Sequence, residues 1–219
     1  MAIILEALVF LVDLSFSLIT DHIHFSTDFN ILLQKYSQIW TPKKIDVFKK
    51  FASDFSVQFF WMLNVFVGII VGVSSSAIFF WLEFIAWFGF LWNELKYMSF
   101  WEKSLYMGFF RGIIYAPFTF VGYFGKSKNY ILLAFVILAF YVLITPILAM
   151  IYKKTKSIIY PSIFNGIIFS TSVLSTFFIV GADELIIGFY GLAGIFVLLT
   201  ANVVLYYFYI KNFRIISKK

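Results

Sequence analysis

The chain has no cysteine and few charges. The absence of cysteine excludes disulfide bonds, thiolate metal sites and a cysteine nucleophile. Only 13% of the 219 residues are charged, whereas a soluble domain has about a quarter. Two histidines are too few to suggest a metal-binding set, so we expect neither a metal nor another cofactor.

Apolar residues take the place of the missing charge. They make up 62% of the chain, including 31 phenylalanines, and the mean hydropathy is +0.94. A single soluble core could not hide this much apolar surface, because a soluble surface needs charge. The predicted fold class is therefore all-α, a polytopic transmembrane helix bundle in a lipid bilayer. The net charge of +6 is explained by basic loops, so we expect no nucleic-acid partner.

Seven stretches are long and apolar enough to span a membrane, which takes about 20 residues each. They cover 2–20, 56–74, 77–95, 104–122, 129–152, 157–180 and 185–210. The first is weakened by Glu6 and Asp13, and the second and third could be one broken unit, so the range is six to eight elements. We divide the chain into an N-terminal span with a basic interfacial segment (1–55), a transmembrane core (56–210) and a basic tail (211–219).

Basic residues set the expected orientation. They gather in 21–55, in KKTK at 153–156 and in the tail, and seven spans would place all three on one side of the membrane. The positive-inside rule then puts the C-terminus in the cytoplasm, with the cell membrane as the expected location. DVFKKFASDF, residues 46–55, has apolar residues at helical spacing with lysines between them, which favours an interfacial helix.

Two ionisable side chains fall deep inside expected spans. Glu83 lies in 77–95 and Arg111 in 104–122, at comparable depths if each residue rises about 1.5 Å. Such groups are costly in a bilayer and face protein or water. One hypothesis is an ion pair between Glu83 and Arg111. The alternative is a protonated Glu83 and an Arg111 that extends to an interface.

Between about 60 and 205 lie three blocks, LEFIAWFGFLWNEL, GFFRGIIYAPFTFVGY and KSIIYPSIFNGIIF. Together they resemble the CPBP family, the CAAX prenyl protease and bacteriocin-processing intramembrane endopeptidases. LEFIAWFGFLWNEL (82–95) is similar to the family's Glu-Glu-x-x-x-Arg-Gly motif. GFFRGIIYAPFTFVGY (108–123) is similar to its second block, where a histidine precedes a small residue and proline. KSIIYPSIFNGIIF (156–169) is similar to its His-x-x-x-Asn block. The order and separation of the three blocks also fit.

The resemblance implies that a glutamate and a histidine activate water, and that a histidine and an asparagine stabilise the oxyanion. Position by position, only the first glutamate survives, as Glu83. The family's second glutamate, arginine, two histidines and asparagine correspond to Phe84, Phe88, Tyr115, Asn165 and Phe169. Arg111 is a candidate replacement for the lost arginine as the partner of Glu83.

This set of residues is unfavourable for hydrolysis. A general base needs a pKa near neutrality, and the pKa of a tyrosine such as Tyr115 is ordinarily about 10. Asn165 could still donate to an oxyanion, but Phe169 cannot. Loss of one oxyanion donor costs about a hundred- to a thousandfold in rate, and here several groups are missing together.

The preferred interpretation is a pseudoprotease that binds or scaffolds a membrane partner. The partner would be an apolar peptide, another membrane protein or a lipid, held at a former cavity lined by the substituted residues. Two other functions stay open. One is a divergent endopeptidase that uses Glu83 with Tyr115 or Asn165, and the other is a structural subunit of a larger membrane complex.

Overall fold

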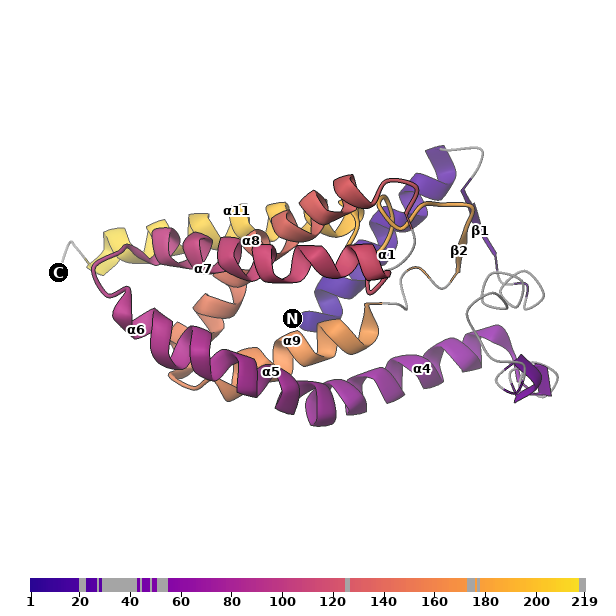
Figure 1. Cartoon of the computed structure of the whole chain (residues 1–219), viewed down its shortest axis with the longest axis horizontal. Helices are drawn as coiled ribbons and strands as arrows, with labels where there is room; N and C mark the ends of the chain where they lie inside the picture. Colours follow the sequence, from indigo (N-terminus) through magenta and orange to yellow (C-terminus); the bar gives the residue numbers. More distant parts are fainter. Residues whose placement is uncertain are drawn as a thin grey trace.

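The computed structural model describes residues 1–19, 23–26, 28, 43, 45–47, 49–50, 55–124, 127–172, 176 and 178–216. Parts of the interfacial helix expected over 46–55 lie outside these residues, and so do the last three residues of the tail. The described chain is a bundle of helices with one two-residue strand pair (Figure 1). The all-α class predicted from composition is therefore confirmed.

Helices form nearly all of the named elements. In chain order these are α1 (Ala2–Ile19), β1 (His24–Phe25), α4 (Val57–Val71), η1 (Gly72–Ser76), α5 (Ala77–Phe84), η2 (Ile85–Leu91), α6 (Trp92–Glu94), α7 (Phe100–Tyr115), η3 (Ala116–Val121), α8 (Tyr130–Thr155), α9 (Ile159–Thr171), β2 (Ile179–Val180) and α11 (Leu192–Ile216).

Three helices within the described residues are long and apolar enough to cross a membrane. They are Ala2–Ile19, Gln58–Glu94 and Tyr130–Thr155, and Leu192–Tyr207 is apolar but shorter. This agrees with a membrane protein. The seven separate spans expected from hydropathy are not all present as such, and the differences have identifiable causes.

The stretches expected as separate spans at 56–74 and 77–95 form one continuous bent helix, from α4 to α6 (Figure 1). The serine run 74–76 does not end it, because the hydroxyls of Ser74 and Ser75 donate to the carbonyls of Ile70 and Val71 at 2.6 and 3.4 Å. These bonds satisfy the serines within the helix, which widens into a π-helical turn at η1. The 37 apolar-rich residues 58–94 extend about 55 Å, longer than the roughly 30 Å hydrocarbon core.

A structured loop separates the helices expected over 157–180 and 185–210, so the first ends early, at Thr171, and the second begins late, at Leu192. Gly181 and Gly188 have φ values of +85° and +83°, which glycine adopts readily. Asp183 accepts the N–H groups of Leu185 and Lys128, both at 2.9 Å. Burial raises the pKa of Asp183, but these hydrogen bonds outweigh burial and hold the pKa below its usual value.

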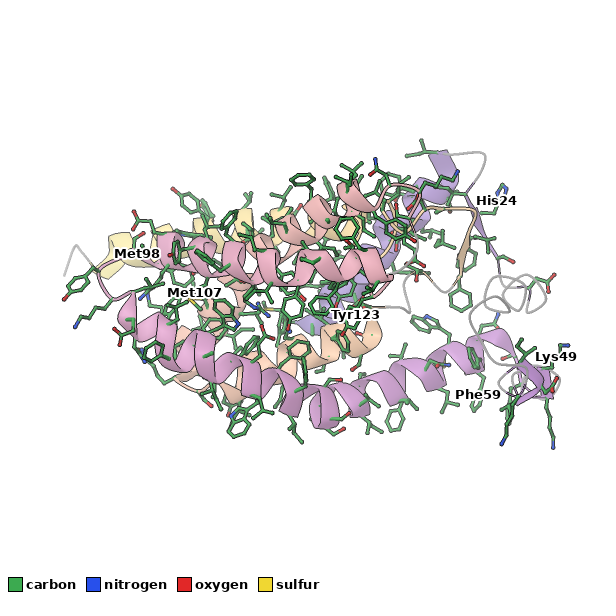
Figure 2. The ribbon with its side chains drawn as sticks, viewed as in Figure 1. His24, Lys49, Phe59, Met98, Met107 and Tyr123 are labelled. Carbon is green, nitrogen blue, oxygen red and sulfur yellow. The ribbon has the colours of Figure 1, made fainter. Side chains whose placement is uncertain are left out.

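Because α4 to α6 form one continuous helix rather than two spans, the loops that share an end of the molecule differ from those expected. His24 pairs with Val180, in the same loop that binds the Lys128 backbone. Figure 2 shows His24 and Lys49 at the end opposite Met98. Lys153 lies 5.5 Å from the ring centroid of Phe100, which places the KKTK link at the Met98 end. The expectation that 21–55 shares a side with KKTK therefore does not hold for its described residues.

Glycines allow two pairs of helices to approach closely. A Cβ on Gly108 of α7 would lie 2.7 Å from the Tyr141 carbonyl oxygen of α8, and one on Gly112 would lie 2.9 Å from Leu138 Cα. A Cβ on Gly72 would lie 2.6 Å from Ile167 Cα of α9. Small residues permit this packing in lipid, where no hydrophobic force drives helices together. Hence α7 pairs with α8, and the long helix pairs with α9.

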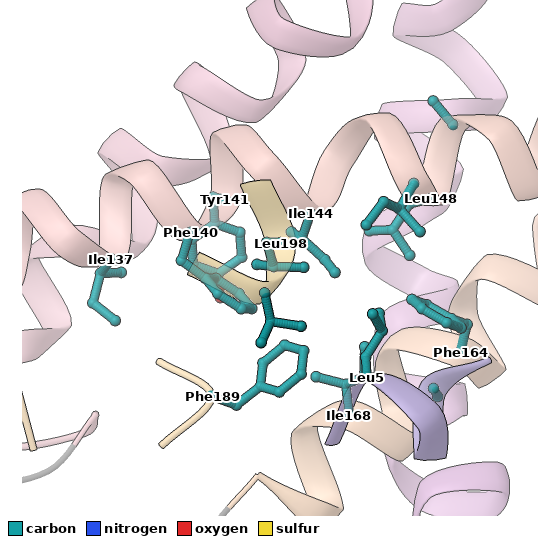
Figure 3. Packing of buried hydrophobic residues seen from close by; sticks show 14 of the residues in the cluster. Leu5, Ile137, Phe140, Tyr141, Ile144, Leu148, Phe164, Ile168, Phe189 and Leu198 are labelled. Atoms are coloured by element: carbon teal, nitrogen blue, oxygen red, sulfur yellow. The ribbon is translucent and has the colours of Figure 1, made fainter. Parts of the chain in front are cut away.

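A buried apolar core joins the remaining helices (Figure 3). Leu5 of α1 meets Ile168 of α9, Ile144 of α8 and Leu198 of α11, and Phe189 from the preceding loop closes the cluster. All five side chains are buried. This core holds α1, α8, α9 and α11 in fixed positions around the polar residues described next.

Gly72→Ala should destabilise the bundle, whereas Gly89→Ala on the same continuous helix should not. The added methyl group at residue 72 meets the α9 backbone, and overpacking of this kind costs about 1–3 kcal/mol. At residue 89 the nearest atoms are 4.0 Å away, and alanine improves helix propensity by up to about 1 kcal/mol. Thermal unfolding in detergent, followed by circular dichroism, measures both variants. Equal unfolding midpoints would contradict the close approach of α9.

Candidate functional site

A polar cluster lies between α5, α7 and α8. Arg111 donates from Nε to Glu83 Oε1 at 2.9 Å and from Nη1 to Thr145 Oγ1 at 3.3 Å. The Tyr115 hydroxyl donates to Glu83 Oε2 at 3.1 Å. Of the two alternatives left open by the sequence, the structure therefore has the ion pair. Both oxygens of the Glu83 carboxylate are engaged by protein donors.

Aromatic rings enclose the guanidinium of Arg111. Its Cζ lies 5.0 Å from the ring centroids of both Phe84 and Tyr141, within cation–π range. Tyr115 stacks on Tyr141 with centroids 4.5 Å apart. The Arg111 side chain is 0% exposed and that of Glu83 is 14% exposed. The charge is thus shielded from lipid, and Arg111 does not extend to an interface.

Helical spacing brings the cluster together. Arg111 and Tyr115 lie one turn apart on α7, as do Tyr141 and Thr145 on α8. The glycine contacts of α7 press the two pairs against each other. Tyr141 and Thr145 were not among the predicted site residues. The signal that could have found this helix pairing is the Gly-x-x-x-Gly spacing of residues 108 and 112, which flank Arg111.

Phe84 and Phe88 pack rather than line an open cavity. Both side chains are fully buried, and their rings meet edge to face with centroids 5.1 Å apart. Phe88 also stacks on Tyr152 of α8 at 5.4 Å. From the sequence, these residues were expected to line a former protease cavity. Because the rings fill the space between α5, η2 and α8, that expectation is wrong for these two positions.

The two predicted positions on α9 lie at the edge of this arrangement. Phe169 contacts Phe80 edge to face at 5.5 Å, and Phe80 in turn lies 6.2 Å from Phe84. Asn165 is buried one turn earlier on α9, which packs against α5. The structure thus brings Glu83, Arg111 and Tyr115 into direct contact, and it links Phe169 to Arg111 through two intervening rings, Phe80 and Phe84.

Two acidic residues of α1 form a second polar feature that the sequence analysis treated only as a weakness of the span. Glu6 Oε1 accepts a hydrogen bond from the Thr171 hydroxyl at 3.2 Å. Asp13 is fully buried, and its two carboxylate oxygens lie 3.0 and 3.1 Å from the Gly188 N–H donor. Seven residues apart, they project from one side of α1 toward α9 and the loop before α11. They anchor α1 to the bundle.

Arg111→Met should be less stable than the double variant Glu83→Gln/Arg111→Met. Removing the arginine alone leaves a carboxylate without its partner, which costs about 3–5 kcal/mol for a buried pair. The double variant carries no charge there. Unfolding midpoints in detergent measure both, with Lys96→Met as an exposed control that loses the same charge. A single variant as stable as the double would show that the pair contributes nothing.

Asp13→Ala should destabilise the chain by about 1–3 kcal/mol, because the buried Gly188 N–H loses its acceptor. Asp13→Asn should lose less, since the amide oxygen can still accept that hydrogen bond. Asp46→Ala removes an equivalent carboxylate from an exposed position and should have little effect. The same unfolding assay compares the three. Identical losses for Ala and Asn at residue 13 would argue against the hydrogen bond as the cause.

The cluster is chemically suited to holding helices together. Within the described residues, no three His, Cys, Asp or Glu side chains gather in a way that could hold a metal ion.

Comparison of the chain with family models, with curated proteins and with solved structures finds no match. The resemblance to the CPBP family therefore rests on the motif positions quoted above.

Proposed function

We propose that this chain is a pseudoprotease of the membrane. In this proposal it shares the helical organisation of CPBP-type intramembrane endopeptidases, does not hydrolyse peptides, and binds or scaffolds a membrane partner. The proposal combines the all-α membrane-type structure with the motif positions of residues 82–169. Hydropathy and helix length by themselves indicate a helical protein suited to a bilayer, and the proposal adds a function to that description.

The main support for the proposal is that both oxygens of the Glu83 carboxylate accept hydrogen bonds from protein side chains. A general base must reach the proton that it removes, within about 2.6–3.2 Å or through one water. In this chain Glu83 Oε1 is paired with Arg111 and Oε2 accepts the Tyr115 hydroxyl. A tyrosine that donates to the carboxylate competes with water for it. The position of the family's second glutamate is a buried ring, Phe84, which faces the guanidinium.

The partner in this proposal contacts the outside of the bundle. The buried rings leave the former cavity filled, but the long helix exposes large apolar side chains such as Phe59, Phe66 and Phe79. An apolar exterior in a bilayer packs against lipid tails or against the apolar face of another transmembrane segment. A membrane protein or an apolar peptide therefore fits as the partner.

The proposed topology follows from the ends of the bundle. Counting the bent helix 57–94 as one element gives six long helices among the residues that the structure describes, which is the lower end of the expected range. The loop 95–99, the KKTK link and the C-terminus then share one end, and the positive-inside rule assigns this end to the cytoplasm. The proposed location is the cell membrane.

A cleavage assay tests the central claim. The purified full chain is incubated with prenylated peptides and with transmembrane peptides, beside Glu83→Ala and the milder Glu83→Gln. We expect all three proteins to give the same background, and size-exclusion profiles to establish that each is folded. Cleavage by the natural chain that disappears in folded Glu83→Gln would overturn the proposal in favour of a divergent endopeptidase.

A further inference from the structure

A groove of about 940 Å³ lies between α1, α8 and α11, away from the Glu83 cluster. Apolar side chains form its walls, including Leu8 of α1, Ile147 and Ile151 of α8, and Val197 and Val204 of α11. On each helix the lining residues recur every three or four positions, so each helix presents one continuous apolar stripe. The groove is therefore elongated and suits a long, flexible apolar group.

The hydroxyl groups in the groove are already satisfied by their own helices. The Ser15 hydroxyl donates to the Leu11 carbonyl at 2.8 Å, and the Thr200 hydroxyl donates to the Phe196 carbonyl at 3.0 Å. Neither hydroxyl therefore calls for a polar partner. A ligand in the groove can therefore pack against the walls without forming hydrogen bonds to them. An acyl chain, which has no hydrogen-bonding groups, meets this condition.

Positive charge is confined to one end of the groove. Lys153 and Lys154, in the last turn of α8, are the charged side chains that line it, and none of its described lining residues is acidic. Lys153 lies over the ring of Phe100, which positions its ammonium group beside the start of α7. The groove thus combines an apolar channel with a cationic mouth, and this charge pattern complements one anionic group attached to a hydrocarbon chain.

We infer that this groove binds an anionic phospholipid of the bilayer, with an acyl chain between α1, α8 and α11 and the headgroup phosphate at Lys153 and Lys154. Basic residues where transmembrane helices meet the headgroup region are suited to acidic lipids. Along α1 the lining runs from Met1 to Ser15, about 21 Å of helix. This exceeds the roughly 15 Å of one leaflet's hydrocarbon, so the groove can hold a whole chain.

The shape of α8 accounts for the groove. Every lining residue from α8 follows Pro146, and this helix runs obliquely across the bundle while α11 follows its long axis (Figure 1). Just before the proline, the Asn202 amide of α11 donates to the Leu143 carbonyl of α8 at 2.7 Å. The two helices are therefore tied together at Leu143 and leave space for a ligand beyond it, toward the lysines.

Native mass spectrometry of the full chain in mild detergent tests the inference. The protein is titrated with dioleoylphosphatidylglycerol, which is anionic, and with dioleoylphosphatidylcholine, which carries no net charge. One lysine near a headgroup changes affinity for an anionic lipid about fivefold. With two lysines we therefore expect a phosphatidylglycerol preference of about twenty-five-fold, which Lys153→Gln/Lys154→Gln abolishes.

Two further variants locate the site. Lys49→Gln/Lys50→Gln removes the same charge from the opposite end and should keep the preference. Ala201→Trp fills the groove from α11 and should weaken binding of both lipids at least tenfold. Equal binding of the two lipids by the natural chain would overturn the inference. So would an equal loss in the Lys49/Lys50 control, or unchanged phosphatidylglycerol binding by folded Ala201→Trp.

Discussion

The buried guanidinium of Arg111 sets the main constraint on the bundle. An arginine side chain stays protonated in a protein, and the interior of a bilayer cannot solvate it. The helices must therefore supply a carboxylate, a hydroxyl and aromatic faces at one depth, which Glu83, Thr145, Phe84 and Tyr141 do. Any arrangement that separates α5, α7 or α8 leaves the buried guanidinium without one of these partners.

Two kinds of contact hold the helices together, and each has a different role. Close backbone contact, permitted by Gly108 and Gly112 on one side and Gly72 on the other, joins α7 to α8 and the long helix to α9. Such contacts are apolar and contain no directional hydrogen bond between side chains. The Glu83–Arg111 pair crosses from one helix pair to the other, and its directional hydrogen bonds fix their relative depth. Glycine packing thus brings the helices of each pair close together, and the ion pair sets the position of one helix pair relative to the other.

The sequence predicted features that depend on local pattern and missed those that depend on distant partners. The all-α class follows from long apolar runs, and the depths of Glu83 and Arg111 follow from the helical rise. Asp13 was misjudged because its partner, the Gly188 N–H, lies 175 residues away. The serine run at 74–76 could end a helix or bond back to it, and local sequence does not decide between the two.

The ion pair also gives Glu83 a structural role that does not depend on catalysis. In a catalytic motif a retained glutamate suggests retained chemistry. In this bundle, however, losing Glu83 would leave Arg111 buried without a counter-charge, so stability alone is a sufficient reason to keep it. Catalysis would further require a water molecule at the carboxylate, where the Tyr115 hydroxyl already donates to Oε2. A groove of about 940 Å³ between α1, α8 and α11 does not include Glu83 in its lining, so a ligand held there would lie apart from the ion pair.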